Sequence, residues 1–202
     1  MKRMALIISM ALTLVANAQY SSNTTSASVP REVLTDDSTY WTITTLSNMQ
    51  YRNTTPGAYY NTYTSGGGMI VKFKFKENGM YEFMLYVQAN TYGMQNESWT
   101  HVEGTVEFLK NENGKAIFRT HAKKGMYRMN KSGQASSREI SESELRDQHS
   151  NTYLWDRWEN PEDPNNYYLL MLDLDAHPNA NVDDPKTIDP SWISKFHISK
   201  RK

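Results

Sequence analysis

The stretch "FKFKENGMYEF", residues 73–83, places two alternations of apolar and polar residues on either side of an Asn-Gly dipeptide. Alternation with a period of two is typical of half-buried β-strands. A two-residue Asn-Gly turn would pair Phe75 with Glu82 and mix apolar and charged residues on one face. A three-residue Glu-Asn-Gly loop, with Gly79 at positive φ, would pair Phe75 with Tyr81 instead. The sequence therefore predicts a bulged hairpin with one aromatic face and one charged face.

The same Glu-Asn-Gly tripeptide returns at residues 112–114, inside "VEGTVEFLKNENGKAIFRTH" (102–121). The same bulged loop would pair Phe108 with Phe118 and place Gly114 at positive φ. Two successive hairpins of this kind indicate an antiparallel meander, in which neighbours in sequence are neighbours in the sheet. We therefore expect an all-β fold, either an up-and-down meander barrel or a β-sandwich.

Alternating patterns predict further strands along the chain, and long amphipathic helices are absent from the pattern. Residues 136–148 are predicted as a loop with one short helix and a capping box from Ser136 to Glu139. The predicted strands span residues 40–46, 69–76, 80–89, 99–110, 115–122, 125–130, 152–159, 167–175 and 192–199.

The first residues have the order of a secretory signal peptide. A positive pair, Lys2 and Arg3, precedes an apolar run over 4–15 and an Ala-Asn-Ala cleavage site at 16–18. The apolar run is shorter than the roughly 20 residues that a transmembrane helix needs. We therefore expect cleavage before Gln19 and a periplasmic or secreted protein with no transmembrane segment. The chain has no cysteine, which excludes a lipid anchor on cysteine and any disulfide.

After the predicted signal peptide (1–18), residues 19–38 read as a flexible polar lead-in and residues 39–202 as a single β domain. The whole chain carries 22 Lys and Arg against 22 Asp and Glu. Loss of Lys2 and Arg3 changes the formal charge from 0 to −2. Without a basic excess, nucleic acid is not an expected partner, and neither is an anionic membrane surface.

One stretch follows the ligand spacing of a calcium-binding EF-hand loop: "DLDAHPNANVDD", residues 173–184. Pro178 stands where that loop needs glycine, and Asp184 replaces the longer glutamate, so a loop of Asx turns is expected instead. The residues with an oxygen or nitrogen atom at the ligand positions are Asp173, Asp175, His177, Asn179, Asn181 and Asp184. The five histidines, which are His101, His121, His149, His177 and His197, form no recognised ligand motif.

Neither a nucleophile motif nor a phosphate-binding loop occurs in the sequence. We therefore predict no metal, no cofactor and no catalytic residue. A calcium-stabilised or hydrolytic domain is the chemical alternative.

The aromatic residues, 12% of the chain, are the remaining indication of function. One set is expected to point into the barrel, where it either fills a core or holds a small apolar ligand: Val71, Phe73, Phe75, Tyr81, Phe83, Leu85, Val106, Phe108 and Phe118. A second set is expected at the surface: Tyr59, Tyr60, Trp155 and Trp158. Because large residues dominate the inward set, we expect an exported, non-catalytic module that meets a glycan or another protein through surface aromatics. A carrier of a small apolar ligand in the barrel interior is the alternative.

Five stretches between residues 40 and 130 resemble secreted lipocalin-like domains of Gram-negative bacteria. They are "YWTITT" (40–45), the F-x-F-x-x-N-G-x-Y hairpin (73–81), "EGTVEF" (103–108), "NGKAIF" (113–118) and "KGMYR" (124–128). The resemblance implies a closed meander barrel with an apolar interior and a first-strand Trp, here Trp41, at one barrel end. The pattern also includes an Arg packed on that Trp, to which no residue of this chain is matched.

Overall fold

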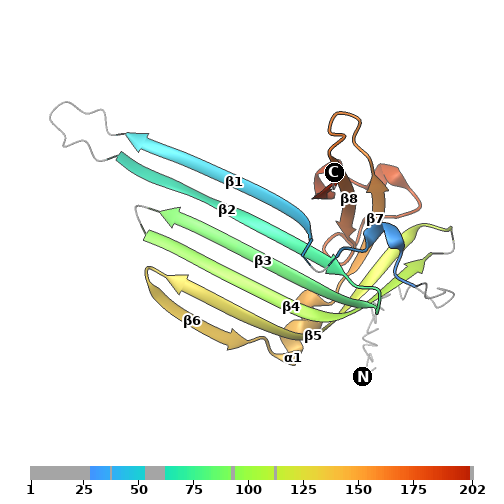
Figure 1. Cartoon of the computed structure of the whole chain (residues 1–202), viewed down its shortest axis with the longest axis horizontal. Coiled ribbons are helices and arrows are strands. Elements are labelled where there is room, and N and C mark those ends of the chain that lie inside the picture. The colour runs from blue at the N-terminus through green and yellow to red at the C-terminus, as the bar shows by residue number, and fades with distance from the viewer. Residues whose placement is uncertain (1–27, 37, 53–61, 92–93, 112, 201–202) are drawn as a thin grey trace, which may run out of the picture.

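The computed structural model describes residues 28–200, apart from 37, 53–61, 92–93 and 112 (Figure 1). The predicted signal peptide therefore lies outside the described residues, as do Tyr59 and Tyr60. The strands are β1 (Trp41–Arg52), β2 (Thr62–Phe75), β3 (Met80–Thr91), β4 (Met94–Lys110), β5 (Ala116–Lys131), β6 (Gln134–Glu139), β7 (Thr152–Trp158), β8 (Asn166–Asp173) and β9 (Ser194–Ser199). The helices are one α-helix, α1 (Glu142–His149), and the 3₁₀ turns η1 (Arg31–Val33), η2 (Pro185–Thr187) and η3 (Pro190–Trp192).

The nine strands form one antiparallel sheet that closes in a ring. The sheet order is β4-β3-β2-β1-β9-β8-β7-β5-β6, and an additional β4–β5 pairing closes the ring. Strand β6 stands outside the ring, because it pairs with β5 alone. The predicted all-β antiparallel meander is confirmed. In the described part of the chain, no helix is long and apolar enough to cross a membrane.

Both hairpin registers predicted from side-chain parity are confirmed. Phe75 pairs with Tyr81 on β2 and β3, and Phe108 pairs with Phe118 on β4 and β5. The two loop glycines have positive φ, 75° at Gly79 and 76° at Gly114. Glycine adopts this conformation without the steric cost of a side chain, which is why it closes both loops.

Three local predictions are wrong. Residues 115–122 and 125–130 belong to one strand, β5, in which Lys123 is an extra residue between the pairs Gly104–Ala122 and Glu103–Lys124. Residues 136–139, which were expected in a loop with one short helix, belong to the strand β6. The capping box lies at Ser141 and Glu144 instead of further upstream, because the helix begins only at Glu142.

Aromatic rings fill the interior of the ring of strands. Phe118 packs on Phe75, Phe108 and Tyr153 with ring centroids 4.8–5.4 Å apart. Phe73 packs in the same way on Phe83 at 5.0 Å. Aromatic pairs at these separations are typical of a packed core. The phenylalanines predicted to point inward therefore contact one another in the interior.

Part of the predicted polar lead-in belongs to this core. Val33 of η1 is fully buried, and its carbonyl oxygen accepts a 2.8 Å hydrogen bond from the Trp41 indole Nε1. The Arg157 guanidinium lies 5.0 Å from the Trp41 ring centroid and 4.1 Å from that of Tyr167. Residues that precede the expected boundary at 39 thus contribute to the core. Arg157 therefore packs on Trp41, a contact for which the sequence pattern identified no arginine.

The strands β1 to β6 continue well beyond the ring, as Figure 1 shows at the left of the view. Strand β9 has one register partner on β1, at Thr42. Strand β7 pairs with β5 only at residues 117–119, and β6 pairs with β5 at 126–131. The far halves of these strands therefore form an open, six-stranded sheet, which we call the distal sheet.

Candidate ligand-binding groove

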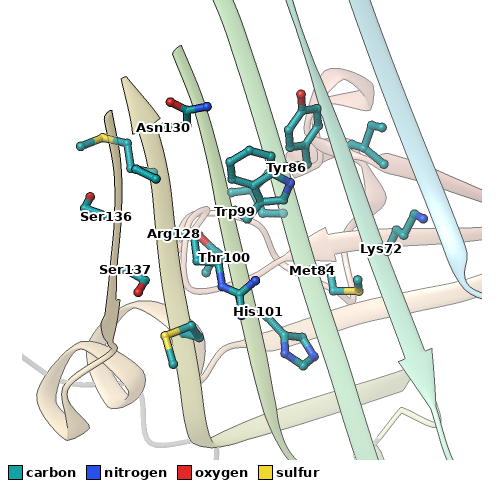
Figure 2. Close-up of a pocket in the computed structure, with 15 residues that line it drawn as sticks. Lys72, Met84, Tyr86, Trp99, Thr100, His101, Arg128, Asn130, Ser136 and Ser137 are labelled. Carbon is teal, nitrogen blue, oxygen red and sulfur yellow. The ribbon is translucent and has the colours of Figure 1, made fainter. Parts of the chain in front are cut away.

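A groove of about 860 Å³ lies on one face of the distal sheet (Figure 2). Two rows of register partners cross its floor. The first row is Ile70, Tyr86, Trp99, Arg128 and Ser137, on β2, β3, β4, β5 and β6. The second row is Lys72, Met84, His101 and Met126, on β2 to β5.

Strand parity places this groove on the face opposite the aromatic core. Successive side chains of a strand point to opposite faces, so Lys72 and Phe73 project in opposite directions. On β5 the parity depends on the extra residue Lys123. Without that residue, Tyr127 would stand opposite Trp99, and Arg128 would turn to the core face. The bulge therefore brings Arg128 into the groove.

Tyr86 and Trp99 form an aromatic surface at the centre of the groove. Their ring centroids are 5.2 Å apart at an interplanar angle of 40°, and Trp99 is 38% exposed. The Tyr86 hydroxyl donates to Glu97 Oε1 at 3.2 Å, and Gln95 Nε2 donates to the same oxygen at 2.6 Å. Burial, together with the Glu97 carboxylate, raises the pKa of Tyr86. The phenol stays protonated, and its hydrogen bond fixes the ring beside Trp99.

Three basic side chains line the groove: Lys72, His101 and Arg128. The Lys72 Nζ lies 5.6 Å from the Tyr40 ring centroid. His101 Nε2 lies 3.8 Å from Glu103 Oε1, and that carboxylate also accepts from Lys124 at 2.9 Å. Arg128 is exposed and makes no ion pair with another described residue. Its guanidinium is therefore available to a ligand.

Apolar side chains complete the floor: Ile70, Met84 and Met126. Methionine has several rotatable bonds and a polarisable sulfur, so it adapts to ligands of different outline. A concave, mostly apolar surface with a few polar groups is the usual form of a small-molecule site. The groove has that form, although it is open to solvent along one side.

The nine residues predicted to face the interior divide between core and groove. Phe73, Phe75, Tyr81, Val106, Phe108 and Phe118 are buried, and Val71 and Phe83 pack against the same core while partly exposed. Leu85, the register partner of Val71, is partly exposed and also borders the groove.

Of the predicted surface aromatics, Trp155 and Trp158 lie among the described residues, and they differ in burial. Trp155 does not lie on the surface: it is 8% exposed and packs edge-to-face on Phe108 at 5.6 Å, because it occupies a core-facing position of β7. Trp158 is partly exposed and packs on Tyr168 at 5.3 Å, with Lys195 Nζ 5.7 Å from its ring centroid.

The sequence prediction missed Tyr86 and Trp99. A signal was present, because Tyr86 is an aromatic residue on the polar side of its strand's alternation. The sequence pattern did not show which residue lies beside Tyr86. The pairing of β3 with β4 places Trp99 there.

The EF-hand-like stretch uses its carboxylates within the fold. Asp173 Oδ1 accepts from the backbone nitrogens of Asp175 and Ala176, both at 3.0 Å, which forms the expected Asx turn. Asp175 Oδ2 accepts from the Thr152 nitrogen at 2.6 Å, and His177 stacks on Trp192 at 4.5 Å. Across the described residues, no group of three or more His, Cys, Asp or Glu side chains could hold a metal ion.

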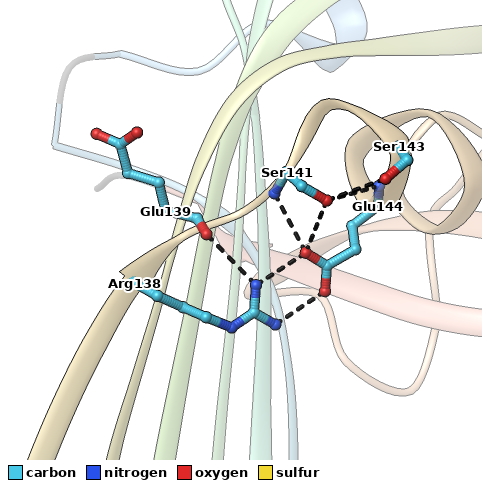
Figure 3. Close-up of polar contacts among 5 residues, drawn as sticks. All are labelled: Arg138, Glu139, Ser141, Ser143 and Glu144. Carbon is cyan, nitrogen blue, oxygen red and sulfur yellow. Dashed lines mark hydrogen bonds and ion pairs between the residues drawn. The ribbon is translucent and has the colours of Figure 1, made fainter.

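The turn from β6 into α1 is held by a network around Glu144, drawn in Figure 3. Arg138 donates from both terminal nitrogens to the two Glu144 oxygens, each at 2.8 Å. Glu144 also accepts from the backbone nitrogen and the hydroxyl of Ser141, at 3.2 and 3.0 Å. This network ties the outer wall of the groove, β6, to the helix.

The same network predicts an acid-sensitive contribution to stability. The hydrogen bonds from Arg138, followed by those from Ser141, lower the pKa of Glu144 from 4.5 to about 2. Because the folded value lies below the unfolded one, the stabilisation is complete above about pH 4.5 and is lost as the pH falls towards 2. Urea unfolding from pH 7 to pH 3 should show the native chain and the Glu144→Gln variant converging as the pH falls.

Glu142→Gln is the matched control, since Glu142 makes no ion pair with another described residue. Its difference in unfolding free energy from the native chain should stay nearly constant over this pH range. A Glu144→Gln difference that is equally constant would contradict a stabilising role for the ionised carboxylate.

Comparison with family models, curated proteins and solved structures finds no match for this chain. The lipocalin-like resemblance of residues 40–130 therefore stays a prediction.

Proposed function

We propose that the protein is an exported, non-catalytic binding module and that its ligand site is the groove centred on Tyr86 and Trp99. The single observation that carries the proposal is this partly exposed aromatic pair, set in a groove of about 860 Å³. Pockets that hold drug-sized ligands span roughly 300–1,000 Å³. Export is supported by the signal-peptide pattern of residues 1–18. The absence of cysteine supports a protein without a lipid anchor on cysteine.

The chemistry of the lining residues supports binding without catalysis. Four residues with a hydroxyl group border the groove: Tyr86, Thr100, Ser136 and Ser137. Among the described residues, none of them is hydrogen-bonded to His101, the groove residue best suited to act as a general base. A nucleophile is activated by hydrogen bonding to such a base. The groove lacks that pairing and offers surfaces for contact instead.

The packed interior favours the groove over the ring of strands as the ligand site. A carrier of the predicted kind would hold an apolar ligand among Phe73, Phe75 and Phe118, yet these three are buried against other rings. Displacing such rings would cost the contacts that stabilise the fold. On the distal sheet, a ligand can bind without disturbing the core.

The test is native mass spectrometry of the protein purified from its own cells without detergent. We expect a non-covalent small-molecule adduct on the native chain and a tenfold or greater loss of its occupancy in Trp99→Ala. The matched control is Trp158→Ala, which removes a partly exposed indole outside the groove. Circular dichroism should confirm that both variants are folded.

An adduct retained by Trp99→Ala but lost by Trp158→Ala would move the site to the other end of the molecule. A clean apo mass, combined with glycan-array binding that survives Trp99→Ala, would replace the proposal with recognition of a glycan elsewhere on the surface.

A further inference from the structure

The charges around the groove are of one sign where a ligand would lie. Lys72 and Arg128 are among the lining residues, and no described Asp or Glu is. The nearest carboxylates on this face have partners or lie to one side. Glu97 accepts from the uncharged Tyr86 and Gln95 and keeps its negative charge at the edge of the aromatic pair, Glu103 pairs with His101 and Lys124, and Glu139 lines a separate, smaller hollow of about 370 Å³. The lining of the groove is thus cationic, at Lys72 and Arg128, although the full sequence has no net positive charge.

Arg128 is placed to act together with the aromatic pair. It is the direct register partner of Trp99, which is the partner of Tyr86. Figure 2 shows the three side chains rising from three neighbouring strands into one groove. From Arg128 on β5 to Ile70 on β2 there are three strand spacings, or roughly 14 Å. A ligand anchored at Arg128 can therefore lay an apolar body of that length over the two rings.

From this arrangement we infer that the groove binds a small anionic amphiphile, an apolar or aromatic body that carries one carboxylate, sulfate or phosphate group. The guanidinium of Arg128 binds the anionic oxygens in its two-pronged geometry, which suits planar and tetrahedral oxyanions alike. Trp99, Tyr86 and Met84 contact the apolar body. This inference rests on the proposed function and adds the ligand class to it.

The probes are 2-naphthoate and its methyl ester, which share one aromatic body and differ in charge. Equilibrium dialysis at 0.15 M salt should show that the native chain binds the naphthoate at least tenfold more tightly than the ester. Arg128→Gln should lower naphthoate affinity tenfold or more and leave ester affinity within twofold. Arg128→Lys should retain part of the preference, because lysine keeps the charge and loses the fork. Arg146→Gln, an exposed arginine on α1, is the control and should change neither affinity.

The outcomes distinguish a wrong ligand class from a wrong binding site. Equal affinity of the native chain for both probes, or a naphthoate preference that survives Arg128→Gln, overturns the anionic ligand class and leaves groove binding in place. If the native chain binds neither probe, the result contradicts both the anionic ligand class and the groove as the ligand site. Co-sedimentation with phosphatidylglycerol vesicles, without binding of free naphthoate, overturns the inference in favour of a membrane surface. Loss of both probes in Trp99→Ala supports the groove itself.

Discussion

Replacing Phe118 by alanine is expected to lower the free energy of unfolding by about 3–5 kcal/mol, the usual cost of deleting a buried phenylalanine ring. Phe118 is 0% exposed. It stacks on Tyr153 at 4.8 Å and meets Phe75 and Phe108 at 5.3 and 5.4 Å. Because these neighbours belong to different strands of the ring, they cannot all collapse into the space that the ring leaves. The cost therefore includes a cavity as well as lost apolar burial.

Urea unfolding followed by circular dichroism measures this effect. Trp99→Ala is the comparison, since it also removes a large aromatic ring but from a side chain that is 38% exposed, and it should cost about 1 kcal/mol or less. A Phe118→Ala cost as small as that of Trp99→Ala would mean that the interior is loosely filled. In that case the carrier alternative, with an apolar ligand inside the ring, would regain support.

Replacing Gly104 by alanine is expected to cost about 3 kcal/mol, at the upper end of what overpacking usually costs. A Cβ at this position would lie 2.0 Å from the His121 carbonyl oxygen and 2.9 Å from the Ala122 Cα. Both are backbone atoms of β5, which cannot turn away as a side chain can. The obstacle is therefore space, and relief requires the two strands to separate at the Lys123 bulge.

Gly114→Ala is the matched control, because a Cβ there has no atom within 4 Å and meets only the positive φ of 76°. That variant should lose on the order of 1 kcal/mol, the cost of holding a side chain in the left-handed conformation. Urea unfolding of the two variants compares the free-energy cost of a steric clash between strands with the cost of a strained backbone conformation. Equal losses would mean that β4 and β5 can move apart at the bulge at no extra cost.

The Gly104 variant also bears on the groove. The bulge sets which face of β5 carries Met126 and Arg128. A variant that folds with an altered bulge should bind anionic probes less tightly, even though Gly104 is not a groove residue.

The hairpin registers were predictable from the sequence by itself. Side-chain parity on both sides of each Glu-Asn-Gly loop allowed only the bulged pairing, and the glycines at 79 and 114 have the positive φ that it needs. These features are local, because a hairpin register is determined by its turn and by which side chains share a face. The all-β meander follows from the same local rules applied along the chain.

Tertiary structure alone decided the groove. Tyr86 and Trp99 are 13 positions apart in sequence, and Arg128 joins them only because one extra residue, Lys123, shifts the parity of β5. A bulge has no characteristic residue type in this sequence. Because it interrupts the alternation of apolar and polar residues, the sequence pattern predicts two strands where the structure has one. Trp155 moved from the predicted surface to the core for a related reason: burial depends on which strands close the ring, and ring closure is a non-local pairing that a period of two does not encode.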